Sequence, residues 1–203
     1  MTGIRFGPPG AEAVHLCVDM QRLFGPGSSW AVPWMEKILP AVTELAAAHA
    51  ARTIFTRFIP PANAGEAVGS WVRYYADWPQ MLRDELSADW LELPPALARY
   101  VPPARQFDKQ LYSPWPDGRL HGFLRAAGIS TLIVTGGETE ICVLATVLGA
   151  IDRGYRVILI SDAVCSSADP THDAAMQIYE SRFGRQIETA PLAELLDQWQ
   201  SPD

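Results

Sequence analysis

The sequence has few cysteines and no long hydrophobic run. Only three of its 203 residues are cysteine, at positions 17, 142 and 165. An odd, sparse count argues against a disulfide framework and favours a reducing compartment. No apolar run approaches the roughly 20 residues that a membrane span needs, and residues 1–10 lack the apolar core of a signal peptide. We therefore expect a cytoplasmic protein that does not bind membranes.

Clusters of basic residues are also absent. The net charge is −7 at pH 7, with 16 Lys and Arg against 23 Asp and Glu. A nucleic-acid partner is therefore not expected. A chain of this length buries about 70% of its unfolded surface without disulfides or a structural metal. We expect a single domain over residues 1–203.

The stretch from Thr131 to Val143 organises the rest of the chain. Leu132–Val134 is typical of a buried strand, and Gly136-Gly137 ends it. Residues 143–151 then form an almost continuously apolar helical pattern. Cys142 is therefore predicted in the first turn of a helix, where unpaired backbone N–H groups favour a thiolate.

Strand and helix patterns alternate along the chain. Strands are predicted at residues 13–18, 53–56, 105–108, 132–134, 156–160 and 186–189, and helices at 33–51, 120–127, 143–151, 170–183 and 191–199. Cys165 is expected in the turn after the fifth strand. This alternation predicts right-handed crossovers and an α/β fold, a parallel sheet with helices on both faces.

Residues 58–103 break this alternation. The stretch is rich in Pro and Gly at first and then aromatic, and long connections of this kind often form a lid or a binding loop. Trp71, Tyr74, Tyr75 and Trp78 recur at helical spacing. They are either a packing stripe, a pocket wall or a subunit interface.

Three reactive side chains lie at the carboxyl ends of predicted strands: Asp19, Lys109 and Cys142. Each has a plain alternative, because a lone Asp is often a turn residue, a lone Lys a surface charge and a lone Cys an apolar filler. The carboxyl ends of parallel strands, however, converge on one edge of a sheet. The three side chains are therefore expected to meet.

Their chemistry suits nucleophilic catalysis. An ammonium favours the thiolate, a carboxylate can take the thiol proton and return one to a leaving amine, and the thiolate can attack an acyl carbon. Backbone N–H groups of residues 137–142 are candidate oxyanion donors. None of the four histidines lies at an equivalent strand end, so they are interpreted as surface or core residues.

Three motifs together resemble the isochorismatase-like cysteine hydrolases: Val18-Asp19-Met20-Gln21, the segment 108–113 (DKQLYS) and the segment 135–143 (TGGETEICV). The resemblance spans about residues 14–189. It implies a three-layer α/β/α fold with a six-stranded parallel sheet. It also implies a catalytic triad of Asp19, Lys109 and Cys142, a cis peptide at Gly137–Glu138, and oxyanion donors in the backbone N–H groups of Glu138 and Cys142.

The sequence departs from the family at two places. Metal-binding nicotinamidases of the family carry an Asp-x-His-type motif after the second strand, where this chain has residues 57–61 (RFIPP). We therefore expect no metal, no other cofactor and no nicotinamidase activity. Glu138 stands where the family usually has a small or apolar residue. Its side chain either acts on charged substrates or points to solvent, and the latter is preferred.

The resemblance favours a cysteine-dependent hydrolase that cleaves a C–N bond of a small amide, carbamoyl, ureido or lactam substrate through a thioacyl intermediate. The alternatives are an isochorismatase-type vinyl-ether hydrolase and a non-catalytic binding protein. Family members often form dimers or tetramers, so a homodimer or homotetramer is expected. Arg57 either pairs a substrate carboxylate or forms a structural ion pair. Candidate substrate-binding residues are Phe24, Arg57, Tyr74, Tyr75, Trp78, Tyr112 and Trp115.

Overall fold

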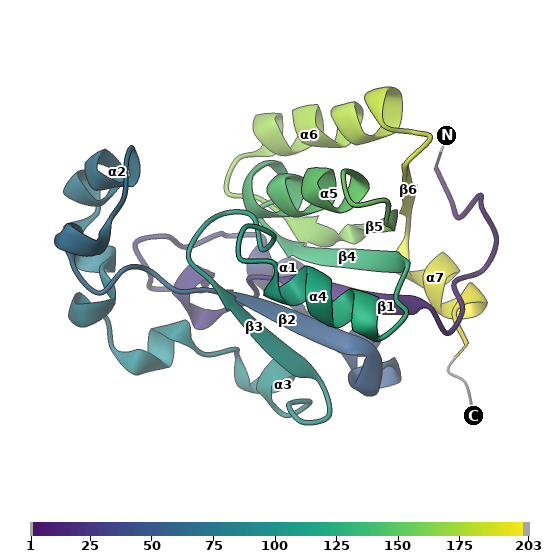
Figure 1. The fold of residues 1–203 in the computed structure, drawn as a ribbon, viewed down its shortest axis with the longest axis horizontal. Helices are drawn as coiled ribbons and strands as arrows, with labels where there is room; N and C mark the ends of the chain where they lie inside the picture. Colours follow the sequence, from purple (N-terminus) through teal and green to yellow (C-terminus); the bar gives the residue numbers. More distant parts are fainter. Residues whose placement is uncertain (1, 201–203) are drawn as a thin grey trace.

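The computed structural model describes residues 2–200. Its centre is a six-stranded parallel sheet in the order β3-β2-β1-β4-β5-β6 (Figure 1). The strands are β1 (Ala13–Val18), β2 (Thr53–Phe58), β3 (Arg105–Lys109), β4 (Thr131–Gly137), β5 (Arg156–Cys165) and β6 (Ile187–Ala190). The predicted fold class is therefore confirmed.

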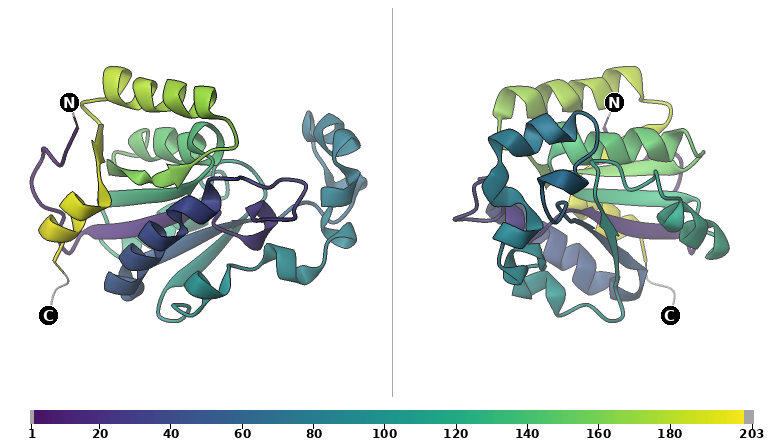
Figure 2. Two further views of the ribbon diagram at one scale, coloured as in Figure 1. Left: turned by 180° about the vertical axis from the view of Figure 1, so that it is seen from behind. Right: turned by 60° about the vertical axis from the view of Figure 1, so that its left-hand side comes forward.

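Helices cover both faces of the sheet (Figures 1 and 2). One layer contains α1 (Met35–Ala48), α3 (Pro95–Ala98) and α7 (Leu192–Gln198), and the other contains α4 (Arg119–Ala126), α5 (Leu144–Ile151) and α6 (Asp169–Arg182). Strand residues alternate between the two cores. Cys17 and Ile133 pack against the first layer, whereas Leu16, Leu132 and Val134 pack against the second.

The helices on both faces explain why the central strands are so apolar. In β1 and β4 every residue is buried, because helices cover both faces of a parallel sheet. His15 is one of the few polar residues there. It lies between the hydroxyls of Thr53 and Thr135, at 3.2 and 2.8 Å, and burial lowers its pKa to about 3. The interpretation of His15 as a core residue is confirmed.

Two strands extend further than the sequence predicts. Arg57 was expected after β2 but lies within it, paired with Asp108 of β3 in the ladder. Cys165 was expected in a turn but is the last residue of β5, where it pairs with Gly137. In both cases the pairing with a neighbouring strand continues past the apolar run. The local sequence pattern does not reveal such pairing between distant segments.

Residues 59–104 are not one irregular loop. They contain α2 (Trp71–Asp77), α3 and four short 3₁₀ helices: η3 (Ala64–Glu66), η4 (Pro79–Met81), η5 (Arg83–Glu85) and η6 (Ala88–Leu91). Two further 3₁₀ turns are η1 (Arg22–Phe24) and η2 (Ala50–Arg52). The part around α2 stands out from the body of the molecule, at the left of Figure 1. No helix among residues 2–200 is long and apolar enough to cross a membrane.

Candidate active site

The turn after β4 is built around glycine. Gly136 has φ +105°, and a Cβ atom there would lie 2.1 Å from the carbonyl oxygen of Val18 on β1. Only glycine fits this close approach. The following peptide, Gly137–Glu138, is cis, as the resemblance implies.

Cys142 then lies in a π-helical turn, η7 (Thr139–Val143), rather than in the first turn of the α-helix itself. Such turns occur often at functional sites. The carbonyl of Glu138 accepts hydrogen bonds from the N–H groups of Ile141 and Val143, both at 3.0 Å. This closes the turn over the segment that holds Cys142.

Side chains of α6 hold the same turn from outside. The Thr139 hydroxyl donates to the carbonyl of Cys165 at 3.0 Å, so Nδ1 of His172, 2.9 Å away, donates to that hydroxyl. The Tyr179 hydroxyl donates to the carbonyl of Thr139 at 2.7 Å. Sequence reasoning missed this set, because nothing local to His172 or Tyr179 indicates which distant backbone they reach.

Asp19 follows β1 in a left-handed conformation, with φ +52°. Asp is one of the few non-glycine residues that tolerate this region. The Thr56 hydroxyl donates to its Oδ1 at 2.7 Å, and the backbone N–H of Asp19 donates to the carbonyl of Thr56 at 3.2 Å. The carboxylate is 1% exposed and held in one orientation.

Lys109, the last residue of β3, reaches across to this carboxylate. Its Nζ lies 2.6 Å from Oδ2 of Asp19 and donates to the carbonyl of Leu111 at 3.0 Å. It also lies 5.3 Å from the centre of the Phe58 ring. Burial would lower the pKa of Lys109, but the Asp19 carboxylate, with a further contribution from Cys142, raises it above its ordinary value. The side chain is therefore an ammonium.

The Cys142 sulfur completes the group, because it lies near enough to Asp19 and Lys109 for both to act on the pKa of its thiol. Asp19, Lys109 and Cys142 come from the ends of three different strands, and the structure brings them together. Burial raises the pKa of the Cys142 thiol, although the charge of Lys109 opposes the rise. The charge of Lys109 thus favours the thiolate, as the sequence predicts, but burial has the larger effect on the pKa. Desolvation outweighs the ammonium, so the resting group is a thiol beside a carboxylate.

A cavity of about 350 Å³ opens beside Cys142. Its floor includes Gly137, Glu138 and Cys142, and Ser167 lies at its edge. Aromatic side chains form much of the remaining wall: Phe24, Trp30, Phe58, Tyr74, Trp78 and Tyr112. Small-molecule sites are typically apolar cavities of about 300–1,000 Å³ with a few polar groups, so this cavity suits a small ligand.

Four of the candidate substrate-binding residues line this cavity: Phe24, Tyr74, Trp78 and Tyr112. Trp30 lines it as well, and sequence reasoning missed it because it lies in a Gly- and Ser-rich loop with no periodicity. Burial raises the pKa of the Tyr74 and Tyr112 hydroxyls, helped by the nearby Glu138 carboxylate. Both hydroxyls are therefore neutral hydrogen-bonding groups.

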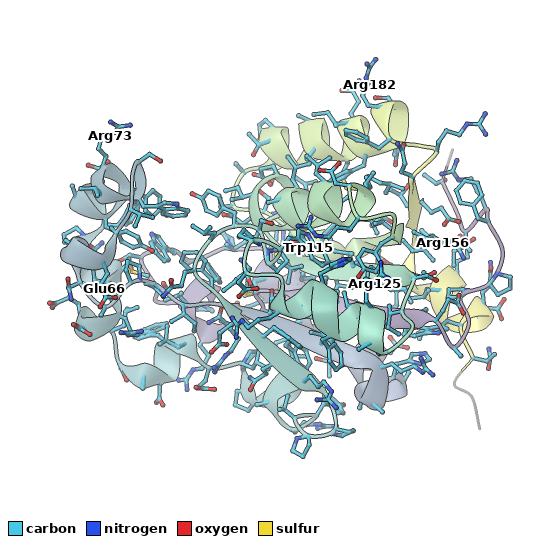
Figure 3. All side chains as sticks on the ribbon, in the orientation of Figure 1. Glu66, Arg73, Trp115, Arg125, Arg156 and Arg182 are labelled. Atoms are coloured by element: carbon cyan, nitrogen blue, oxygen red, sulfur yellow. The ribbon has the colours of Figure 1, made fainter. Side chains whose placement is uncertain are left out.

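Three other candidates lie outside the cavity lining: Trp115, Tyr75 and Arg57. Trp115 packs in the layer of α4 and α5 (Figure 3), where its Nε1 donates to the carbonyl of Thr146 at 2.8 Å. A Cβ atom on Gly149 would lie 2.2 Å from the Trp115 ring, so the indole is a core group packed on α5. Tyr75 is 1% exposed beneath Trp30 and Trp71.

Arg57 forms structural ion pairs. Its Nε and Nη2 donate to the two carboxylate oxygens of Asp108 at 2.8 and 2.9 Å, and Nη1 donates to Glu92 at 2.9 Å. These bonds fasten the 59–104 segment to β2 and β3. Of the two roles considered for Arg57, the structure shows the ion pair. Among residues 2–200 no group of three or more His, Cys, Asp or Glu side chains has the arrangement of a metal site.

Comparison with known proteins identifies the family. The model of the isochorismatase domain matches residues 13–191. The chain belongs to the isochorismatase family. A cysteine hydrolase from Pseudomonas syringae pv. phaseolicola 1448A superposes with a TM-score of 0.79 at 26% identity, over 96% of this chain and 95% of that one. This agrees with the six-stranded fold described above.

Curated relatives match over parts of their length. The N-carbamoylsarcosine amidase of an Arthrobacter species is 26% identical over 178 residues, which are 85% of this chain and 66% of the relative. The isochorismatase family protein YwoC of Bacillus subtilis is 30% identical over 119 residues, 54% of this chain and 58% of the relative. The matches thus span less than two thirds of the length of these relatives.

Proposed function

We propose that this chain is a cysteine-dependent amidohydrolase that cleaves the C–N bond of a small amide, carbamoyl, ureido or lactam compound. One observation carries the proposal. A carboxylate and an ammonium form a buried ion pair, with 2.6 Å between Oδ2 of Asp19 and Nζ of Lys109, and a buried thiol lies near both beside a cavity of small-molecule size. Because burial keeps the thiol protonated, a base must act during attack, and Asp19 is in position to be that base.

The reaction begins when the Cys142 sulfur forms a bond to the acyl carbon and its proton passes to Asp19. The backbone N–H groups of Glu138 and Cys142 stabilise the oxyanion. As the C–N bond breaks, Asp19 gives the proton to the leaving nitrogen, which departs as ammonia or an amine. Water then attacks the thioester carbon and passes a proton to Asp19. The C–S bond breaks, the acid or carbamate leaves, and the proton returns to sulfur.

Lys109 has a supporting role in this scheme. Its ammonium, fixed by Asp19 and the Leu111 carbonyl, counters the charge that develops on sulfur in an environment that otherwise disfavours anions. Lys109 thus stabilises charge and does not itself exchange protons with substrate.

The test is to trap the thioacyl enzyme. The wild-type protein is mixed with a panel of amides, carbamoyl compounds and lactams, quenched in acid, and examined by intact-mass and peptide mass spectrometry. We expect the acyl mass on the peptide that contains Cys142 and on neither of the peptides that contain Cys17 or Cys165. Turnover of a substrate with no adduct, and with undiminished rate in Cys142→Ala, would refute the mechanism. Retained turnover of isochorismate in Cys142→Ala would instead favour a vinyl-ether hydrolase.

A further inference from the structure

Glu138 places a carboxylate at the cavity beside the nucleophile. Its Oε1 accepts a hydrogen bond from the N–H of Ser167 at 2.9 Å, and both residues line the cavity. Its charge acts on the hydroxyls of Tyr74 and Tyr112 and on the Cys142 thiol. The side chain therefore lies at the cavity, although its hydrogen bond with Ser167 remains exposed to solvent.

The cavity wall around this carboxylate is aromatic. Trp30 lies at the centre of the group, with ring-centre distances of 5.8 Å to Tyr74, 6.0 Å to Phe58, and 6.3 Å to both Phe24 and Trp78. The faces of such rings attract cations, and most strongly so when water is excluded. An aromatic wall beside one carboxylate is the combination that recognises an organic ammonium group.

No cationic side chain of the described residues lines this cavity. The two nearby cations are already paired. Arg57 is bound to Asp108 and Glu92, and Lys109 is bound to Asp19. A ligand carboxylate would therefore meet the Glu138 charge without a counter-ion, and like charges at this range repel.

From these observations we propose that Glu138 determines substrate specificity, selecting small amides that carry an ammonium group and rejecting amides that carry a carboxylate. The proposal rests on the proposed function, because it names the substrate class of the same site. In the bound substrate the acyl carbon faces Cys142. The ammonium lies between the Glu138 carboxylate and the aromatic wall.

The turnover test uses two amides that differ only in charge. Betaine amide carries a trimethylammonium group, and 3,3-dimethylbutanamide has the neutral carbon isostere of that group. N-carbamoylsarcosine supplies an anionic comparison. We expect the wild-type kcat/KM for betaine amide to exceed that for the neutral isostere by about tenfold or more. In Glu138→Gln this ratio should fall at least severalfold toward one, because only the aromatic attraction remains, and the relative rate with N-carbamoylsarcosine should rise.

The ratio is the readout because the backbone of residue 138 also belongs to the proposed oxyanion site. A general loss of activity in Glu138→Gln lowers kcat/KM for both isosteres by the same factor, so it cancels in their ratio. Glu140→Gln is the matched control. It removes the same charge two residues away, but Glu140 accepts bonds from Ser166 and Thr171 and its charge acts on Tyr179 and Cys165 rather than on Cys142. The ratio should be unchanged in this variant.

Binding separates this proposal from the proposed function. In Cys142→Ala, calorimetry should show betaine amide binding about tenfold or more tightly than 3,3-dimethylbutanamide, and Cys142→Ala/Glu138→Gln should lose most of that preference. If the preference is present but no amide is hydrolysed, the proposed function fails and the role of Glu138 stands. Equal binding of the isosteres, a preference that survives Glu138→Gln undiminished, or no binding of the cation at millimolar concentration overturns the role of Glu138.

Discussion

At the scale of single residues, burial determines how the nucleophile behaves. Cys142 is 7% exposed and opens on the cavity, whereas Cys17 and Cys165 are fully buried. Burial raises the pKa of the Cys142 thiol above its ordinary value, despite the opposing charge of Lys109. A raised pKa means that the thiolate population is small at neutral pH and grows as the pH rises.

Alkylation of the native protein should show this directly. Iodoacetamide should label Cys142 before Cys17 or Cys165, because only Cys142 reaches the cavity. The rate should be lower at pH 7 than that of an unstructured thiol and should rise about tenfold per pH unit, with no plateau below pH 9. Peptide mass spectrometry over a pH series measures both. A plateau at neutral pH would indicate a preformed thiolate and contradict the raised pKa.

Arg57 is the second residue whose role the structure defines. Arg57→Lys loses the two parallel bonds to Asp108, because an ammonium cannot form them. We expect the free energy of unfolding to fall by about 1 kcal/mol, since the pair is partly exposed to solvent. Urea denaturation measures this change. KM should stay the same, and a raised KM with unchanged stability would instead place Arg57 at the substrate.

At the scale of elements, strand ends were predictable and cavity walls were not. Asp19, Lys109 and Cys142 could be placed together because parallel strands fix where their carboxyl ends lie. The membership of the wall depends on where η1, α2 and the loops next to them lie relative to the strand ends, which local sequence patterns do not fix. Trp30 and Trp115 illustrate the difficulty. Both are tryptophans in loops, yet one lines the cavity and the other packs on α5.

The β4 turn gives a prediction at this scale. Gly136→Ala places a Cβ atom 2.1 Å from the Val18 carbonyl oxygen, at φ +105°. We expect a loss of at least about 2 kcal/mol in the free energy of unfolding, together with loss of the site. Gly122→Ala is the control. Gly122 is exposed in α4 with no heavy atom within 4 Å of its Cβ position, so the stability should rise by about 0.5–1 kcal/mol.

Denaturant titration of the two alanine variants makes the comparison. A Gly136→Ala protein as stable as the wild type would contradict the close packing of β1 against β4. A Gly122→Ala protein that loses stability would show that backbone entropy is not the dominant effect at that exposed helical position.

At the scale of the whole molecule, the part around α2 exposes two valine side chains. Val68 and Val72 are 68% and 48% exposed there, and Arg73 lies at its outer surface (Figure 3). The expected homodimer or homotetramer remains a prediction. Size-exclusion chromatography with light scattering measures the assembly, and a monomer at micromolar concentration would contradict it. If this surface forms the interface, Val72→Asp should shift the mass toward the monomer, whereas Gly122→Ala should not.

The central claim concerns one chemical group: that the Cys142 sulfur carries out C–N bond cleavage. The most direct measurement is ammonia release from a panel of small amides, ureido and carbamoyl compounds by the wild type and by Cys142→Ala in parallel. We predict release by the wild type and a decrease of at least about a thousandfold in the variant, with the fold intact by circular dichroism. Equal rates of ammonia release from the two proteins would contradict the account.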